Sequence, residues 1–270
     1  MSINRPVALI TGASSGIGAE FARQLARNGY DLVLVARRGD KLGEVASSLR
    51  DAAVELLVAD LTDENDVRRI AERLRAEPAI SLLVNNAGFG TLHRFFRTDL
   101  NGQVAMHRLH VMATMTLTHA ALQQMVPRGE GAVINVSSVA AFGVSPGNVS
   151  YCATKTWMNT FTEGLWLELQ SIGSPVKVQA LCPGFTVSGF HDTLGMDKTR
   201  IPASFWTSAD AVVQASLRGL KQGELFVIPG WRYKILIWLS RVAPRRLRHA
   251  VMLRSASRFR KEKAAGTSGN

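Results

Sequence analysis

At 270 residues the chain has the length of one large α/β domain or two small domains, and its 46% apolar and 20% charged residues are typical of a globular protein with a sizeable core. It holds no uncharged apolar run of about 18 residues and no secretory leader, so we expect a cytoplasmic protein without a transmembrane helix. The excess charge is localised: residues 1–230 carry a net charge of +1 and residues 231–270 a net charge of +10, which argues against nucleic-acid binding by the main body.

Short apolar runs recur along the chain, and helix-like segments such as Gly18–Asn28 and Glu64–Ala76 lie between them. Runs dominated by Val, Leu and Ile and ended by turn residues are typical of strands buried on both faces of a parallel sheet. The alternation predicts a doubly wound α/β sheet of about seven strands, a single domain over residues 1–230 with a basic extension over 231–270. The runs are Val7–Ile10, Leu32–Ala36, Val54–Ala59, Leu82–Val84, Ala132–Val136, Val176–Leu181 and Leu225–Ile228.

A glycine-rich turn, Thr11–Gly18, follows the first predicted strand and opens a helix. Its glycines allow the backbone to turn sharply and to approach a pyrophosphate closely, where the N–H groups of the helix N-terminus would bind it. The spacing is GxxxGxG rather than the commoner GxGxxG, and a purely structural turn is the alternative. The candidate cofactor ligands here are Gly12, Ser14, Ser15, Gly16, Ile17 and Gly18.

Two arginines, Arg37 and Arg38, follow the second predicted strand. Sites selective for NAD usually place an acid at this point to bind the ribose 2′-hydroxyl, whereas an arginine accommodates a 2′-phosphate. The sequence therefore predicts NADP(H) as the cofactor, with Arg37 as the main 2′-phosphate ligand and Arg38 in support. The alternative is a pair of solvated arginines at a strand end.

Further motifs follow in a set order: Asp60-Leu61, Asn85–Gly88, Ser138, Tyr151–Lys155 and Pro183-Gly184. Together with the glycine turn, they resemble the short-chain dehydrogenases/reductases over about residues 5–230, and the finer pattern looks like the bacterial DltE-like branch. The resemblance implies a Rossmann-type fold and a homo-oligomer, a dimer or a tetramer. It also places Asp60 at the adenine, Asn86 by the adenosine ribose, and Thr186 with Ser188 near the carboxamide. The further cofactor contacts that it implies are Leu61, Ala87, Gly88, Tyr151, Lys155, Pro183 and Gly184.

The spacing of Tyr151 and Lys155 places them one turn apart on one face of a helix. A phenol titrates near ~10, and a neighbouring ammonium favours the phenolate, so the pair can move a proton at neutral pH. Ser138, at the end of a predicted strand, can hold a substrate oxygen where charge develops. The resemblance assigns Tyr151 as proton donor and acceptor, Lys155 as its modulator and ribose ligand, and Ser138 as the substrate-orienting group. An ordinary surface helix pair is the alternative for Tyr151 and Lys155 taken alone.

The chain departs from the family at His110, where members commonly carry an asparagine that completes a catalytic tetrad. A histidine can donate and accept hydrogen bonds and can titrate near neutral pH. His110 is therefore our fourth candidate catalytic residue, in place of the asparagine. The alternative is a helix-packing residue.

The segment 188–206 follows the Pro183-Gly184 turn and is rich in apolar side chains, with Phe89 and Phe142 on adjoining loops. Such a region fits a lipophilic carbonyl or alcohol, and loop packing is the alternative. Cys152 and Cys182 show no metal-ligand spacing, so we expect reduced, buried thiols and no metal. The expected function is an NADP(H)-dependent interconversion of a carbonyl and an alcohol, and the alternative is an NADP(H)-binding regulatory or scaffold protein. The apolar residues of the segment 188–206 are Phe190, Leu194, Met196, Phe205 and Trp206.

The extension beginning at Trp231 mixes aromatic and aliphatic side chains with arginines and lysines. Such a segment can lie on an anionic bilayer surface as a peripheral contact. It can equally pack on its own body or on a partner subunit, leaving a solvated basic face. Its candidate apolar anchors are Trp231, Ile235, Leu236, Trp238 and Leu239.

Overall fold

The computed structural model describes residues 5–50, 52–76, 79–91, 94–187 and 201–259, with side chains as far as residue 254. Seven parallel strands form the central sheet in the order β3-β2-β1-β4-β5-β6-β9, which confirms the predicted doubly wound fold. The chain changes direction between β1 and β4, so their carboxyl ends border the crevice in which sheets of this kind bind ligands. The strands are β1 (Val7–Thr11), β2 (Asp31–Ala36), β3 (Val54–Val58), β4 (Ile80–Asn85), β5 (Ala132–Val136), β6 (Lys177–Leu181) and β9 (Phe226–Val227).

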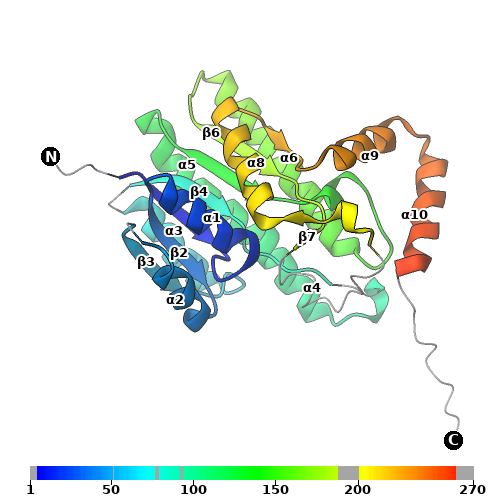
Figure 1. Cartoon of the computed structure of the whole chain (residues 1–270), viewed down its shortest axis with the longest axis horizontal. Coiled ribbons are helices and arrows are strands. Elements are labelled where there is room, and N and C mark those ends of the chain that lie inside the picture. The colour runs from blue at the N-terminus through cyan, green and yellow to red at the C-terminus, as the bar shows by residue number, and fades with distance from the viewer. Residues whose placement is uncertain (1–4, 51, 77–78, 92–93, 188–200, 260–270) are drawn as a thin grey trace, which may run out of the picture.

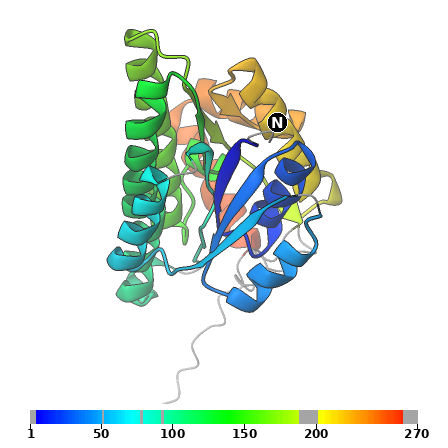
Figure 2. The same cartoon turned by 90° about the vertical axis from the view of Figure 1, so that its left-hand side faces the viewer.

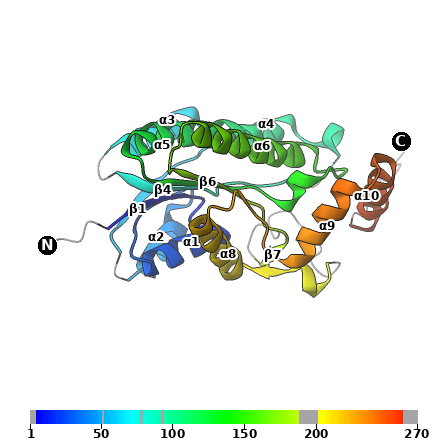
Figure 3. The same ribbon diagram turned by 90° about the horizontal axis from the view of Figure 1, so that it is seen from above.

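Helices cover both faces of the sheet (Figures 2 and 3). One face carries α1 (Gly16–Arg27), α2 (Gly39–Ser47) and α8 (Ala209–Gln222), and the other carries α3 (Glu64–Arg75), α4 (Leu100–His107), α5 (Thr114–Arg128) and α6 (Val149–Ser171). A π-helical turn, η2 (Arg108–Ala113), joins α4 to α5, and two short 3₁₀ turns, η1 (Phe95–Arg97) and η3 (Val139–Phe142), precede α4 and follow β5.

Alternate residues of each strand pack into one of two cores. On β1, Ala8 and Ile10 face the core that Phe21 and Leu25 of α1 complete, whereas Leu9 belongs to the core of α3 and α5. The prediction that every strand is buried on both faces is wrong for β3, where Leu56 and Val58 are 41% and 54% exposed. The reason is its position, because β3 forms one edge of the sheet and is only partly covered by its neighbours.

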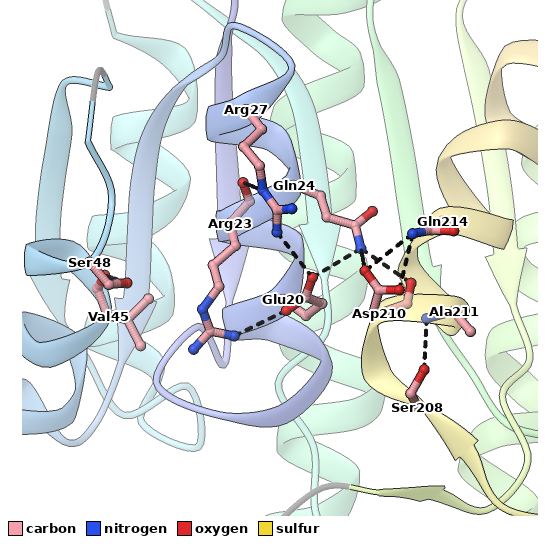
Figure 4. Close-up of polar contacts among 10 residues, drawn as sticks. All are labelled: Glu20, Arg23, Gln24, Arg27, Val45, Ser48, Ser208, Asp210, Ala211 and Gln214. Carbon is pink, nitrogen blue, oxygen red and sulfur yellow. Dashed lines mark hydrogen bonds and ion pairs between the residues drawn. The ribbon is translucent and has the colours of Figure 1, made fainter.

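A small second sheet lies beyond the carboxyl end of the main one. It pairs β7 (Thr186–Val187) with β8 (Thr207–Ser208), and α8 begins immediately after β8 with Ser208 as its N-cap, whose Oγ accepts from the Ala211 N–H at 3.1 Å. Figure 4 shows how α8 is fastened to α1: Gln24 donates to Glu20 at 3.0 Å and to the Asp210 carboxylate at 3.0 Å. The position of β8 is therefore fixed relative to the helix that follows the glycine turn.

The basic extension, as far as residue 259, is largely helical and lies beyond the carboxyl ends of the strands (Figures 1 and 3). Helix α9 (Trp231–Val242) buries Tyr233 and Ile237 against the body, and α10 (Arg245–Phe259) follows it. The five candidate apolar anchors, Trp231 among them, are not packed against the body, and each is at least 47% exposed. No helix in the described ranges combines the length and apolarity needed to cross a bilayer.

Candidate active site

The glycine turn is held against the end of β4 by a compact set of hydrogen bonds. The Thr11 hydroxyl accepts from the backbone N–H groups of Asn86 at 2.9 Å and Ala87 at 3.0 Å, and the Asn86 side chain donates to the Thr11 carbonyl at 2.8 Å. Gly12 has a φ of +66°, and a Cβ there would lie 2.8 Å from the Ala87 Cα. The close approach of the two loops therefore requires a glycine at position 12. The Thr11 hydroxyl, a contact that the sequence did not predict, is the acceptor that joins them.

Helix α1 begins beside this turn with its N-terminus suited to an anion. Its N-cap, Ser15, makes no side-chain capping bond, and its first turn carries no acid. Uncapped N–H groups and the helix dipole together favour a phosphate at this position. A Cβ on Gly18 would overlap the Gly12 carbonyl oxygen, so this glycine serves the packing of helix on turn. Ile17 is half-buried against the core.

The two arginines after β2 point in different directions. Arg38 donates to the hydroxyl oxygens of Ser14 at 3.3 Å and Ser15 at 3.2 Å, whereas Arg37 lies 3.8 Å from the Asp60 carboxylate. Arg37 and Asp60 are both well exposed, with side-chain exposures of 66% and 42%. The residue that the sequence analysis ranked second therefore lies on the glycine turn, and the first-ranked one faces an acid. Leu61, next to Asp60, is buried.

Ser138, Tyr151 and Lys155 come together where β5 meets α6. Their side chains are linked by a hydrogen bond between Ser138 and Tyr151, and the Lys155 Nζ lies 5.8 Å from the centre of the Tyr151 ring. The Ser138 Oγ also accepts from the Ala140 N–H at 3.1 Å, and the Lys155 ammonium donates to the Val136 carbonyl at 2.7 Å. Strand β5 thus positions both partners of the tyrosine.

Burial shifts the pKa of both ionisable members of this group. It raises the pKa of Tyr151 to about 12, an effect that the Ser138 hydrogen bond partly offsets, and it lowers the pKa of Lys155 to about 7. Desolvation acts in opposite directions because it disfavours the phenolate in one case and the ammonium in the other. The expectation that the neighbouring ammonium brings Tyr151 towards the phenolate is therefore not borne out: burial outweighs it, and the phenol keeps its proton. Lys155 can gain or lose a proton close to neutral pH.

His110 lies in the π-helical turn and is fully buried. Its Nδ1 lies 2.9 Å from the Thr154 hydroxyl, and its Nε2 accepts from the Phe89 N–H at 3.2 Å. The Thr154 hydroxyl donates its hydrogen bond to the Tyr151 carbonyl at 3.0 Å, so it must accept one from Nδ1, which therefore carries a hydrogen. Because Nε2 is an acceptor, the ring is neutral. A Cβ on Gly88 would lie 2.8 Å from Nε2, so the imidazole also explains that glycine.

The electrostatics agree with a neutral His110. Burial, followed by the charges of Lys155 and His107, holds the pKa of His110 well below its usual value of 6.5. The imidazole ring also lies beside the rings of Phe89 and Tyr151, with centroid separations of 6.1 Å and 5.9 Å. The imidazole therefore bridges the loop after β4 and the helix that carries the tyrosine.

A chain of buried amides and hydroxyls supports the two strands beneath the site. Asn85 donates to Thr118 at 3.0 Å and to Asn135 at 2.9 Å, and Asn135 donates to Thr162 of α6 at 3.0 Å. The Ser137 hydroxyl donates to the Lys155 carbonyl at 3.1 Å. Sequence reasoning missed these roles, although an asparagine inside the apolar run Ala132–Val136 was a signal for a buried polar contact.

The Pro183-Gly184 turn is held from two sides. The Pro183 carbonyl accepts from the Val139 N–H at 3.0 Å, which connects the turn to Ser138. From α9, the Tyr233 hydroxyl accepts from the Phe185 N–H at 2.9 Å and donates to the Phe205 carbonyl at 2.7 Å. The Tyr233 ring occupies the space that a side chain on Gly184 would need.

Thr186, the next implied cofactor ligand, is buried on β7 and donates to the Gly184 carbonyl at 3.1 Å. Ser188 lies outside the described residues, as do Phe190, Leu194 and Met196. Cys152 and Cys182 are both buried thiols, as expected, and no disulfide joins them. Burial also raises the pKa of Cys182 to about 12.

Comparison with known proteins gives a consistent result. A profile described as short chain dehydrogenase matches residues 6–198. An uncharacterized oxidoreductase of Staphylococcus saprophyticus is 34% identical over 182 residues, which cover 66% of this chain and 77% of that protein. Membership of the DltE-like branch stays a prediction.

Solved structures extend the similarity over nearly the whole chain. A short-chain dehydrogenase from Sphingobium yanoikuyae in complex with NADPH has a TM-score of 0.79 and 34% identity, covering 97% of this chain and 99% of that one. A bulky-bulky ketone specific alcohol dehydrogenase from Comamonas testosteroni has a TM-score of 0.75 and 30% identity, covering 97% of both chains. Since the profile spans well over half of the sequence and the fold agrees, this protein belongs to the short-chain dehydrogenase family.

Proposed function

We propose that this protein is an NADP(H)-dependent oxidoreductase that interconverts a carbonyl and an alcohol on a lipophilic small molecule. The observation that carries the proposal is the meeting of Ser138, Tyr151 and Lys155 at the carboxyl end of β5, with the tyrosine protonated and the lysine near its titration point. A protein that only bound the cofactor would need no such group, which argues against the regulatory or scaffold alternative.

The nicotinamide, when bound, gives or takes the hydride. In the direction of reduction, Tyr151 holds at its hydroxyl the proton that the substrate oxygen requires, and Ser138 orients that oxygen by a hydrogen bond. A positive Lys155 close to the phenol ring stabilises the phenolate left after the transfer. In the direction of oxidation the same groups act in reverse, with the phenolate accepting the proton of the alcohol.

The cofactor half of the site has the features that a dinucleotide with a 2′-phosphate needs. Arg38 and the serine hydroxyls that it contacts provide a cation and two hydroxyl groups beside the N-terminus of α1, and Arg37 provides a second cation. The NADPH complex of the Sphingobium relative supports the same choice of cofactor. We propose Arg38 as the principal 2′-phosphate ligand, since Arg37 has Asp60 to compete for it.

Two charge reversals test this assignment of the cofactor. Titrating NADPH and NADH against the wild type should show tighter binding of NADPH, and Arg38→Asp should weaken NADPH by roughly 1.5–3 kcal/mol while leaving NADH within a few-fold. Arg37→Asp is the matched control and should have the smaller effect. Equal binding of the two cofactors by the wild type would contradict the NADP(H) proposal, and a larger effect of Arg37→Asp would reverse the ranking.

Aromatic side chains near the catalytic group support a lipophilic substrate. The ring of Phe142, which follows Ser138, packs on Phe226 with a centroid separation of 6.3 Å, and Phe185 packs on Trp206 at 5.7 Å. The name of the Comamonas relative, a bulky-bulky ketone specific enzyme, agrees with this class. The test is a panel of aryl and alkyl ketones followed by NADPH absorbance, in which turnover should rise with apolar bulk. Turnover of small hydrophilic carbonyls alone would contradict it.

We assign His110 a positioning role rather than a catalytic one. Both of its ring nitrogens are engaged, one with Thr154 on α6 and one with the Phe89 N–H, and an imidazolium would leave that N–H without an acceptor. His110 thereby orients the helix turn between Tyr151 and Lys155. A proton relay through His110 would need an imidazole whose pKa lies near neutral pH, whereas burial holds the pKa of His110 well below its usual value.

A homo-oligomer and a cytoplasmic location complete the proposed function. The helices α4 to α6 form one side of the molecule and expose several large apolar residues, which suits contact with a second copy (Figure 3). These residues are Leu100, Val104, Met112, Met115 and Leu167. Light scattering at several protein concentrations tests the proposal, and a monomer at all of them would contradict it.

A further inference from the structure

Helix α9 is apolar on two opposite sides, and only one of them contacts the rest of the molecule. Tyr233 and Ile237 form the inner side and are 7% and 8% exposed. The outer side carries Trp231, Ile235, Trp238 and Val242, whose spacing of four, three and four residues places them in one row along the helix. These four side chains, here named the outer stripe, are exposed by 66%, 47%, 62% and 62% respectively.

Cations flank the outer stripe and no acid accompanies them. By helical periodicity, Arg232 lies to one side of the row, where it also donates to the Ser204 carbonyl at 2.8 Å. Lys234 and Arg241 lie to the other side, and the Arg241 guanidinium also lies over the Phe142 ring, 5.5 Å from its centre. The first turn of α10 adds exposed Arg245, Arg246 and Arg248, and the sequence from 231 to 261 contains no Asp or Glu. An apolar row bordered by basic residues, with tryptophans in it, is the pattern of helices that lie in the interface of an anionic bilayer.

The charge of the segment argues against a second copy of this chain as its partner. A two-fold interface brings the same surface of two subunits together, so the stripe of one copy would lie among the cations of the other. Without an acid in the segment, this contact would place like charges side by side. The side formed by α4 to α6 has exposed apolar residues without such a uniform charge and suits self-association better.

The outer stripe lies on the side of α9 that faces away from the active site. Tyr233 on the inner side holds Phe185 and Phe205, whereas the outer stripe faces away from them. A surface that binds the stripe would therefore lie one helix diameter, about 10 Å, from the Pro183-Gly184 turn. Substitutions in the stripe leave the hydroxyl of Tyr233 and its two backbone partners unchanged.

We propose that the outer stripe and the flanking arginines and lysines bind the surface of an anionic phospholipid bilayer, with α9 lying parallel to it. The apolar side chains enter the boundary between headgroups and acyl chains, and the cations remain at the lipid phosphates. The contact is peripheral and sensitive to salt, because the electrostatic part of the attraction is screened within a Debye length.

Co-sedimentation of the full chain with vesicles tests the proposal. We expect binding to vesicles of equal parts phosphatidylcholine and phosphatidylglycerol at low salt, release at high salt, and little binding to pure phosphatidylcholine. The double variant Trp231→Ser/Trp238→Ser should reduce binding at least tenfold. Arg245→Glu/Arg246→Glu should also reduce it, by more than about 25-fold, since each basic residue removed near an anionic surface costs about fivefold.

Two matched variants serve as controls. Arg218→Glu/Lys221→Glu makes the same charge change on exposed residues of α8, and Leu56→Ser/Ile172→Ser removes exposed apolar groups from β3 and from the C-terminal end of α6. Both should bind vesicles within about two- to threefold of the wild type. Equal losses in these controls, or binding to neutral vesicles that ignores salt, would overturn the proposal.

The oligomeric state gives the decisive alternative outcome. Should Trp231→Ser/Trp238→Ser dissociate an oligomer in the absence of lipid, the stripe is an interface between copies and the membrane proposal fails. NADPH oxidation with a water-soluble ketone should stay within about twofold of wild type in every variant. Because that assay does not involve vesicles, failure of docking and failure of the proposed enzymatic function are distinguishable.

Discussion

Helices α6 and α9 both bring a tyrosine and nearby cations to the carboxyl end of the sheet, yet the two tyrosines do different things. On α6, Tyr151 bonds to another side chain, Ser138, and lies beside a single buried cation, Lys155. On α9, the Tyr233 hydroxyl is engaged by two backbone groups, the Phe185 N–H and the Phe205 carbonyl. The Tyr151 hydroxyl therefore lies near one side chain, Lys155, that can change its protonation, whereas the Tyr233 hydroxyl lies between backbone groups that cannot.

The cations differ in the same way. Burial lowers the pKa of Lys155 to about 7, whereas the arginines and lysines of α9 and of α10 as far as Arg254 lie at the surface. A buried cation beside a phenol affects proton transfer, while many exposed cations beside tryptophans create an attractive field for anions. The comparison teaches that the environment, and not the residue type, separates the catalytic tyrosine from the structural one.

Removing the Tyr151 hydroxyl should have the largest effect on function. We expect Tyr151→Phe to lower kcat by about 10²- to 10⁴-fold, the usual contribution of a positioned general acid, while NADPH affinity changes little because the ring still packs. Steady-state kinetics and NADPH fluorescence titration measure the two quantities. A Tyr151→Phe enzyme that keeps most of its rate would break the distinction between the two tyrosines.

Replacing Lys155 should reveal its shifted pKa as a pH-dependent stability. Between the folded pKa of about 7 and the ordinary value of 10.5, the unfolded chain binds a proton that the folded chain lacks, so this lysine adds stability as pH rises through that window. Lys155→Met removes the dependence. The difference in unfolding free energy between variant and wild type should therefore change by about 1.4 kcal/mol per pH unit there, most in favour of the variant at low pH.

Denaturant titrations at several pH values measure this difference. Lys177→Met, an exposed lysine on β6, is the matched control and should show a flat difference over the same range. A flat difference for Lys155→Met as well would mean that the ammonium is not destabilised by burial.

Tyr233→Phe should affect stability rather than chemistry. It leaves a donor on Phe185 and an acceptor on Phe205 without their partner, a cost of about 1–3 kcal/mol, which lowers Tm by about 2–4 °C per kcal/mol in a chain of this size. Calorimetry measures the shift. Tyr30→Phe, on a half-buried tyrosine at the amino end of the sheet, is the control and should shift Tm less. A large loss of kcat in Tyr233→Phe without a change in Tm would contradict the structural role.

His110 should show the smallest effect on chemistry. Since burial holds the pKa of His110 well below 6.5, we expect the pH profile of kcat between about 6 and 8 to have the same shape in His110→Asn and wild type. The loss of the Phe89 contact should appear instead as a lower Tm. If the wild-type pH profile of kcat contains a titration step that is missing in His110→Asn, His110 takes part in proton transfer and the positioning role is wrong.

The sequence by itself determined the elements and much of the site. Apolar runs located the seven strands of the central sheet to within two residues, because a buried strand needs a continuous run of apolar side chains. They did not predict the two short strands β7 and β8. The four-residue spacing of Tyr151 and Lys155 set their common face, and the position of Ser138 after a strand brought it to the same edge. These are local regularities, and backbone geometry alone translates them into structure.

Other features depended on contacts between distant parts of the chain. The order of the strands, the partial exposure of β3, and the contacts of His110 with residues 21 and 44 positions away follow only from the packed fold. The same holds for the directions of the two arginines after β2, since Arg38, and not the first-ranked Arg37, contacts the serines of the glycine turn. A strand end shows which residues are near the cofactor, but the direction of each side chain depends on its neighbours in space.

The extension illustrates the limit most clearly. Its composition predicted a basic, apolar segment, and the sequence named five anchors, all of which the fold leaves exposed while burying Tyr233 and Ile237. The sequence of a helix with apolar residues on two opposite sides does not reveal which side meets the protein. The contacts of Tyr233 determine the inner side. Its ring fills the space beside Gly184, and its hydroxyl accepts from the Phe185 N–H and donates to the Phe205 carbonyl.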